Sequence, residues 1–226
     1  EVASVDPRQG IFFYTLDQQK LPKPRFERCD TCLQCHMSGA LPGVPGLMVR
    51  SVYPDKYGMP LFAAGSFVTD HRSPLKERWG GWYVSGMHGS QFHMGNTLAQ
   101  DRNKTGNSDP EGQNVTDLGA YLDTTAYLAP HSDIVALMAL EHQTHMTNLI
   151  TRVGFETRLA VHDSDAMNKA LGGPAGELTE SATKRINNAV EELMEYMLFT
   201  QETRLTEPVR GVSGFSEAFA RSGPRD

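Results

Sequence analysis

The chain has 226 residues, of which 39% are hydrophobic and 21% are charged, and its formal net charge at pH 7 is −6. This balance predicts a globular protein of about one domain and excludes a largely disordered chain. The acidic charge, without a basic stripe carrying interleaved aromatic residues, argues against a nucleic-acid-binding protein. The apolar runs are too short for a transmembrane segment.

The first half of the chain predicts short strands separated by irregular backbone. Residues 11–16 (IFFYTL) predict a strand, and residues 37–60, rich in glycine and proline, predict irregular structure. Residues 61–69 and 81–85 predict two more strands because aromatic and β-branched side chains are frequent in them. The polar residues 95–116 predict a surface loop.

Two long helices are predicted in the second half. The first is expected to begin after Ser132 as the N-cap and to end at Arg152, before Gly154. The second is expected within residues 179–205, with a Thr-Glu start. Helical spacing predicts one inward face on each helix, formed by Val135, Met138, His142, His145 and Leu149 in the first and by Ile186, Val190, Leu193, Met194 and Met197 in the second.

These elements predict an α+β fold. A small, loop-rich antiparallel β part would precede the two long C-terminal helices. No break in composition marks a linker, so residues 1–226 are expected to form a single domain.

All three cysteines lie in one short stretch, Cys29-Asp-Thr-Cys32-Leu-Gln-Cys35-His36. An odd number of thiols disfavours a disulfide framework. An iron–sulfur cluster would lack its usual fourth thiolate. A zinc site would have to take Cys29, Cys32, Cys35 and His36 as four ligands from eight contiguous residues, which can hardly surround a tetrahedral ion.

The remaining interpretation is the Cys-x-x-Cys-His pattern of covalent haem attachment, at residues 32–36. Its spacing has a mechanical reason, because two thiols add to the two vinyl groups of one porphyrin edge and the next imidazole then lies under the iron. The pentapeptide resembles the c-type cytochromes. That resemblance implies one covalent haem c, with Cys32 and Cys35 as the thioether residues and His36 as the proximal iron ligand. Cys29 falls outside the motif and has no assigned role.

Two longer segments carry a second resemblance. Residues 78–96 (RWGGWYVSGMHGSQFHMGN) and 141–149 (EHQTHMTNL) are similar to an uncharacterised group of exported bacterial haem-c proteins. This resemblance implies a periplasmic or extracellular location, and it implies a single haem-c domain that is either complete or part of a longer polypeptide. The first residues, EVASVDP, fit a chain whose export signal has been removed.

A six-coordinate haem needs a second axial ligand, and the chain offers eight histidines and ten methionines in all. His88, His93 and Met94 lie within a glycine-rich segment that would let the backbone approach a flat cofactor. His93 is the first candidate for the distal ligand, because it is farther than His88 from the predicted strand and Gly95 follows closely. Met94 is the second candidate, and His145 is the third.

The predicted function is one-electron transfer by a monohaem c-type cytochrome, an electron carrier without catalytic residues. Its partners would be redox proteins, and a place within a larger redox assembly is compatible with the sequence. Lys20, Lys23, Arg25 and Arg28 lead into the cysteine stretch and predict a basic rim suited to acidic partners.

The alternative function is a haem-c sensor domain, with a PAS-like sheet within residues 53–85 and a labile distal ligand. A peroxidase-like enzyme with an open iron is less favoured, because a single haem makes electron relay harder. Neither alternative changes the assignment of Cys32, Cys35 and His36.

Overall fold

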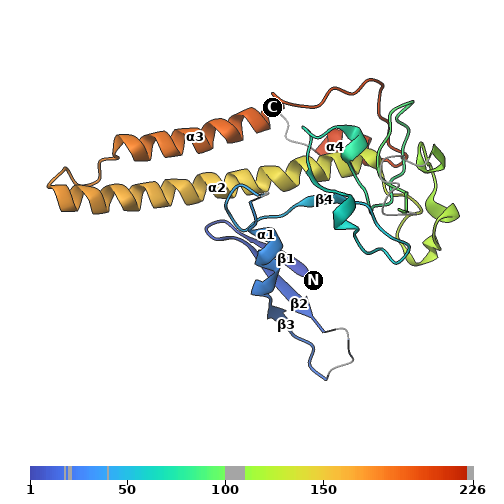
Figure 1. Ribbon diagram of the computed structural model, residues 1–226, viewed down its shortest axis with the longest axis horizontal. Coiled ribbons are helices and arrows are strands. Elements are labelled where there is room, and N and C mark those ends of the chain that lie inside the picture. Colours follow the sequence, from blue (N-terminus) through green and yellow to red (C-terminus); the bar gives the residue numbers. More distant parts are fainter. Residues whose placement is uncertain (18, 20–21, 40, 100–109, 223–226) are drawn as a thin grey trace. The chain divides into compact units, whose positions relative to one another are not determined.

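The computed structural model describes residues 1–17, 19, 22–39, 41–99 and 110–222 (Figure 1). They form a mixed α+β structure with small antiparallel sheets and long helices, which confirms the predicted fold class at this level. The strands are β1 (Val2–Asp6), β2 (Gly10–Leu16), β3 (Phe26–Arg28), β4 (Val49–Val52) and β5 (Ser66–Thr69). The helices are α1 (Leu33–His36), α2 (Ile134–Leu171), α3 (Glu180–Met197) and α4 (Phe215–Ser222).

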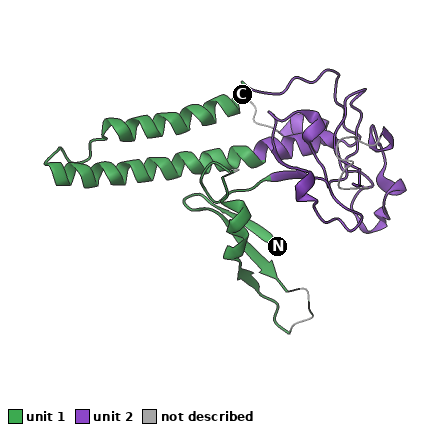
Figure 2. Cartoon of the chain, in the orientation of Figure 1, with its two compact units in different colours: residues 1–48, 144–200 green, residues 49–143, 201–226 purple. Residues whose placement is uncertain are grey.

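The chain divides into two compact units (Figure 2). Unit 1 comprises Glu1–Met48 and Thr144–Thr200, and unit 2 comprises Val49–Gln143 and Gln201–Asp226. Helix α2 is continuous and contributes residues to both. The expectation that residues 1–226 form a single domain stays a prediction.

The sheet of unit 1 has the order β1-β2-β3, with antiparallel neighbours. The strand predicted at residues 11–16 is confirmed as β2, which pairs Ile11 with Val5 and Tyr14 with Arg28. Ile11 and Phe13 are buried, as the two-residue period of a strand requires for side chains on one face. The sheet therefore buries an apolar face along the first half of β2, where the Phe13 carbonyl accepts from the Cys29 N–H at the start of the cysteine stretch.

Helices α2 and α3 form an antiparallel hairpin in unit 1, joined by ion pairs between Arg152 and Glu192 and between Arg185 and Glu156. The predicted end of the first helix before Gly154 is wrong, since α2 continues to Leu171. A mid-helix glycine costs about 1 kcal/mol relative to alanine, and packing against α3 outweighs that cost. The Thr179 hydroxyl caps α3 by accepting from the Ala182 N–H at 3.2 Å.

The residues buried in this hairpin differ from those predicted. Val190, Met194 and Met197 were expected to face inward, but all three are exposed. The residues buried along the hairpin are mostly small, namely Ala160, Ser164, Ala182 and Ala189, with Tyr196 near the end of α3. The hairpin therefore buries mainly small side chains and leaves several larger apolar residues of α3 exposed.

Unit 2 contains the two-stranded antiparallel sheet of β4 and β5 and a core of buried side chains at the start of α2. That core consists of Leu75, Trp79, Val84, Ile134 and Leu137. The N-cap of α2 is Asp133 rather than the predicted Ser132, because the Asp133 carboxylate accepts from the Val135 and Ala136 N–H groups.

Two strand predictions for unit 2 need correction. Residues 81–85 form no strand, and the predicted strand 61–69 shortens to β5 after a 3-10 turn at Phe62–Ala64. β5 pairs instead with β4, within the segment that was expected to be irregular. The paired strands expected for a PAS-like sheet in residues 53–85 are therefore not formed.

A fully buried ion pair links the loop after β5 to α2. Arg78 Nη1 donates to Glu141 Oε2 at 3.1 Å, and both side chains are at most 2% exposed. The Thr69 hydroxyl donates to Glu141 Oε1 at 2.7 Å. Arg78 also donates to the backbone oxygens of His71 and Ser73. Both members of the ion pair therefore make further hydrogen bonds.

Burial raises the pKa of Glu141 from 4.5 to about 7, although Arg78 and Thr69 favour the ionised form. Between these two values the folded protein holds a proton that the unfolded chain has lost, so stability falls as pH rises. The Glu141→Gln variant cannot titrate. Between pH 4.5 and 7.5 the wild type should therefore lose at most about 3 kcal/mol of unfolding free energy relative to the variant. Urea titrations across this range test the expectation, and a constant difference contradicts it.

Candidate haem attachment site

The cysteine stretch folds as one compact helical turn in unit 1. A 3-10 turn at Asp30–Cys32 runs directly into α1 (Leu33–His36). The Cys29 N–H donates to the Phe13 carbonyl at 2.8 Å, which ties the start of the turn to β2. In a helical turn, residues three and four apart share a face, so Cys32, Cys35 and His36 lie on one side of it.

The His36 ring is held in one orientation by the backbone. Its Nδ1 lies 2.9 Å from the Gly46 carbonyl oxygen. A carbonyl only accepts, so Nδ1 carries the proton and Nε2 keeps its lone pair. This is the tautomer that a metal-binding imidazole needs. The Phe13 ring lies against the His36 ring, with 4.4 Å between centroids.

The Gly46 segment that holds His36 is itself fixed from two sides. The Gly46 N–H donates back to the His36 carbonyl at 2.9 Å, so the two residues are joined by two hydrogen bonds. Asn148 of α2, which is buried, accepts from the Leu47 N–H and donates to the Leu47 carbonyl. A Cβ on Gly46 would lie 2.5 Å from the Asn148 side-chain oxygen, so only glycine fits there.

Gly46 and Asn148 are the positioning residues that the sequence did not reveal. A Pro-Gly pair at 45–46 indicates only a turn. An asparagine within a helix next to the apolar Leu149 is a signal for a buried polar contact, but it does not say with which residue. The pairing joins segments 101 positions apart, so it depends on the tertiary fold.

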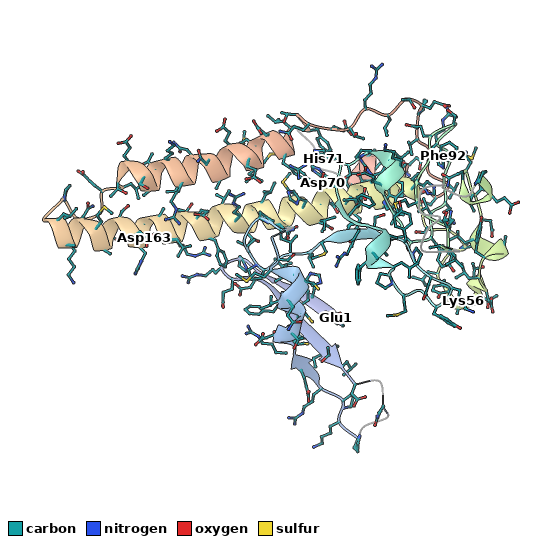
Figure 3. All side chains as sticks on the ribbon, in the orientation of Figure 1. Glu1, Lys56, Asp70, His71, Phe92 and Asp163 are labelled. Carbon is teal, nitrogen blue, oxygen red and sulfur yellow. The ribbon has the colours of Figure 1, made fainter. Side chains whose placement is uncertain are left out.

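The three thiols are free and differ in their surroundings. Cys35 is exposed, whereas Cys29 and Cys32 are half-buried. The Cys32 thiol donates to the carboxylate of Glu1, a residue labelled in Figure 3, at 2.9 Å. This hydrogen bond is the main reason why the pKa of Cys32 rises to about 12. Within the described part of the chain, no three His, Cys, Asp or Glu side chains are grouped as metal ligands.

A cavity of about 180 Å³ lies beside the turn in unit 1. Its lining includes Phe12, Phe13, Cys29, Leu33 and Phe155, but none of the three motif residues. This volume is below that of typical small-molecule sites. This cavity is therefore too small to hold a group of porphyrin size.

The predicted distal candidates His88, His93 and Met94 belong to unit 2, whereas Cys32, Cys35 and His36 belong to unit 1. The His93 side chain is 1% exposed, and its ring contacts the rings of Trp79 and His88. Burial, with the neighbouring His88, lowers the pKa of His93 to about 3. Burial also lowers the pKa of His88. Both imidazoles are therefore neutral at physiological pH, as ligands must be.

Each distal candidate of unit 2 is already hydrogen bonded. His93 Nδ1 accepts from the Gly95 N–H at 3.0 Å, so a neutral ring carries its proton on Nε2. His88 Nε2 accepts from the Asn114 N–H at 3.1 Å, and its Nδ1 has no hydrogen-bond partner among the described residues. Met94 Sδ accepts from the Ser51 hydroxyl at 3.6 Å.

His145, the third candidate, belongs to the same compact unit as His36. It is half-buried on α2, and its ring lies 4.7 Å from the ring of Tyr196, between centroids. His142, three residues earlier, belongs to unit 2 and contacts His71, with 2.9 Å between their Nδ1 atoms. The two neighbouring histidines of α2 thus have different surroundings.

The structure describes three of the four residues of the predicted basic rim. Lys23, Arg25 and Arg28 are exposed, and Lys20 lies outside the described residues. Arg28 pairs with Asp30 at 2.7 Å and lies over the Phe12 ring, so its charge is partly neutralised. The described residues thus leave Lys23 and Arg25 as the main cationic side chains of the rim.

Comparison of the chain with protein-family models, with curated proteins and with solved structures finds no match. No described helix combines the length and the apolar character needed to cross a membrane.

Proposed function

We propose that this chain is a monohaem c-type cytochrome that transfers single electrons. The observation that carries the proposal is the arrangement of His36 within the Cys-x-x-Cys-His turn. Two cysteines and the histidine share one helical face, and the Gly46 carbonyl fixes the tautomer that leaves Nε2 able to bind iron. All three cysteines of the chain lie in this stretch, so no thiol accompanies any of the other histidines in the sequence.

The residues of unit 1 would have distinct tasks. Cys32 and Cys35 would hold the porphyrin edge by thioether bonds, and His36 would bind the iron from one side. The hydrogen bond from His36 to Gly46 orients the ring and leaves Nε2 with the lone pair that would bind the iron. When bound, haem supplies a reversible one-electron couple.

The cellular setting follows from the same proposal. Covalent attachment keeps the cofactor on the protein outside the cell, so we propose a bacterial periplasmic or extracellular location. Redox proteins would be the partners, and the exposed Lys23 and Arg25 are available to acidic ones. We propose no catalytic residues.

A spectroscopic experiment tests the proposal. The purified chain should keep its Soret absorbance after acid-acetone extraction and should exceed the mass of the polypeptide by one haem. It should also be reduced and reoxidised reversibly, with little response to carbon monoxide. Loss of all colour on extraction contradicts the haem proposal. Strong carbon monoxide binding favours the sensor alternative instead, because that function requires a labile distal ligand.

His93 remains the proposed distal ligand, and the lowered pKa that keeps its imidazole neutral supports this role. A neutral His93 can bind iron through either nitrogen only by giving up the hydrogen bond from Gly95. That loss costs about 1 kcal/mol, which is small beside a metal–imidazole bond. The proposal therefore includes a local rearrangement at residues 93–95.

We predict that His93→Ala converts the haem to a high-spin form that binds carbon monoxide, because no second imidazole would then block the iron. Absorption spectra at pH 7 measure the change. The matched control is His145→Ala, which should keep the low-spin spectrum. If the His93 variant stays low-spin while the His145 variant changes, the ligand is His145, and if neither changes, Met94 should be replaced next.

A further inference from the structure

A second cavity, of about 550 Å³, lies in unit 2. Its walls are mainly aromatic and apolar, and they include Pro54, Trp82, Tyr83, Leu98 and Tyr121. This volume lies within the range of small-molecule sites, which the cavity beside Cys29 does not reach. The described residues of its lining include no histidine, cysteine or methionine, so the cavity shares no residue with the candidate haem site.

The walls of this cavity are held in place by hydrogen bonds within unit 2. Trp82 Nε1 donates to the Arg50 carbonyl at 2.8 Å, and the Trp82 carbonyl accepts from the Asn96 N–H at 2.9 Å. Beside Leu98, the Ala99 N–H donates to the Pro54 carbonyl at 2.7 Å. The cavity is therefore formed before any ligand arrives, as is usual for small-molecule sites.

Most polar side chains of the lining are already engaged by the protein itself. The Asn96 amide makes three hydrogen bonds to backbone groups of Val84 and Gly112. The hydroxyls of Thr97 and Tyr121 both donate to backbone carbonyls. A ligand rich in hydroxyl groups, such as a sugar, would therefore find few side-chain donors here.

Two polar groups of the lining remain available to a ligand. The Tyr83 hydroxyl makes no hydrogen bond with the described residues, and its ring lies 6.4 Å from that of Tyr121. The Lys56 ammonium makes no ion pair with the described residues and lies 4.9 Å from the centroid of the Tyr57 ring. Lys56 is the one charged residue of the described lining, so the cavity has a positive charge at its edge.

The turn that carries Lys56 keeps this charge from being neutralised. The carboxylate of the neighbouring Asp55 accepts from the Tyr57 N–H at 2.8 Å and from the Met59 N–H at 2.9 Å. Asp55 is thus engaged by the backbone of its own turn, and it does not belong to the described lining. Lys56 itself is exposed, and Figure 3 labels it.

We propose that this cavity binds a planar aromatic carboxylate. The rings of Trp82, Tyr83 and Tyr121 favour a flat aromatic body, which can stack on them or meet them edge to face. The Lys56 ammonium would pair with the single negative charge, while the Tyr83 hydroxyl can donate to the same carboxylate. A cationic ligand would be repelled by Lys56. This binding site does not depend on the proposed haem.

Calorimetric titration of the full chain with two matched probes tests this proposal. 2-Naphthoate carries the ring system and the charge, whereas 2-naphthalenemethanol carries the same rings without the charge. The wild type should bind one 2-naphthoate with a dissociation constant below about 1 mM, which a ligand of this size reaches at ordinary efficiency. It should bind the neutral probe about three- to fivefold more weakly, and about 0.5 M NaCl should reduce that preference.

Two variants separate the role of the charge from that of the rings. Lys56→Met keeps the length of the side chain but removes its charge, so both probes should bind with similar dissociation constants. Tyr83→Leu removes an aromatic wall and should weaken the binding of both probes by about fivefold or more. The matched control is Lys76→Met, which removes an exposed lysine of unit 2 outside the described lining and should leave both constants unchanged.

Circular dichroism should show the same helix content in all variants, because Lys56, Lys76 and Tyr83 are exposed. Several outcomes would overturn the proposal. These are a wild type that binds neither probe, equal binding of both probes to the wild type, a preference for 2-naphthoate that survives in Lys56→Met, and loss of that preference in Lys76→Met. Binding of 2-naphthoate that is unchanged in Tyr83→Leu would also place the ligand elsewhere.

Discussion

Replacing both Cys32 and Cys35 with alanine should abolish covalent haem attachment, whereas Cys29→Ala should leave it intact. Thioether bonds need both motif thiols in register with the porphyrin edge, and Cys29 lies outside that register. The double variant should lose all Soret absorbance that resists acid-acetone extraction, and it should have the mass of the bare polypeptide. Each single variant should keep at most one thioether bond.

Cys29 is a demanding control, because it is half-buried like Cys32 and lies three residues from it in the same turn. Equal loss of haem in the Cys29 variant would show that all three thiols act together, as an iron–sulfur or zinc site would require. Analysis for iron, zinc and sulfide in the wild type then identifies which of these sites is present. Retained attachment in the double variant contradicts the haem proposal outright.

Arg78→Met should destabilise the protein by about 3–5 kcal/mol at pH 8, because it leaves the Glu141 carboxylate buried without its counter-ion. The change also deprives the His71 and Ser73 carbonyls of their donor. Urea unfolding followed by circular dichroism measures the loss. At pH 5 the loss should be smaller, because Glu141 is then protonated in the wild type and in the variant, and no charge is left without a counter-ion.

Arg72→Met provides the comparison. Arg72 pairs with Asp70 at 2.6 Å, but its side chain is 34% exposed, and pairs open to solvent contribute only about 0–1 kcal/mol. If Arg72→Met and Arg78→Met lose the same unfolding free energy, then the burial of the Arg78–Glu141 pair does not determine how much it contributes to stability.

The sequence predicts those parts of the fold that depend on local patterns. The strand at residues 11–16 and both long helices follow from spacing and capping, and the coarse α+β class follows from them. Helix ends were less well predicted, because α2 continues past Gly154 owing to its packing against α3. The inward face of α3 was wrong for the same reason, since a large apolar side chain indicates burial in general but not against which neighbour.

The residues of the candidate site also fall into two groups, those that the sequence predicts and those that it does not. Cys32, Cys35 and His36 are recognisable in the sequence because their chemistry depends on a spacing of five residues. Gly46 and Asn148 are not recognisable, because their roles arise only when distant segments meet. The choice among His93, Met94 and His145 stays a prediction, since a distal ligand depends on the folded arrangement and not on a local motif.

The support of His36 by both Gly46 and Asn148 has a consequence for the order of maturation. Haem can be attached to an unfolded chain, since the two thiols and the histidine lie within five residues. The clamp on Leu47, in contrast, closes a loop of 101 residues, and contacts of such long sequence separation form late in folding. If the chain carries the proposed haem, the cofactor would thus be acquired first, and the imidazole would gain its final orientation only once Asn148 of α2 binds Leu47.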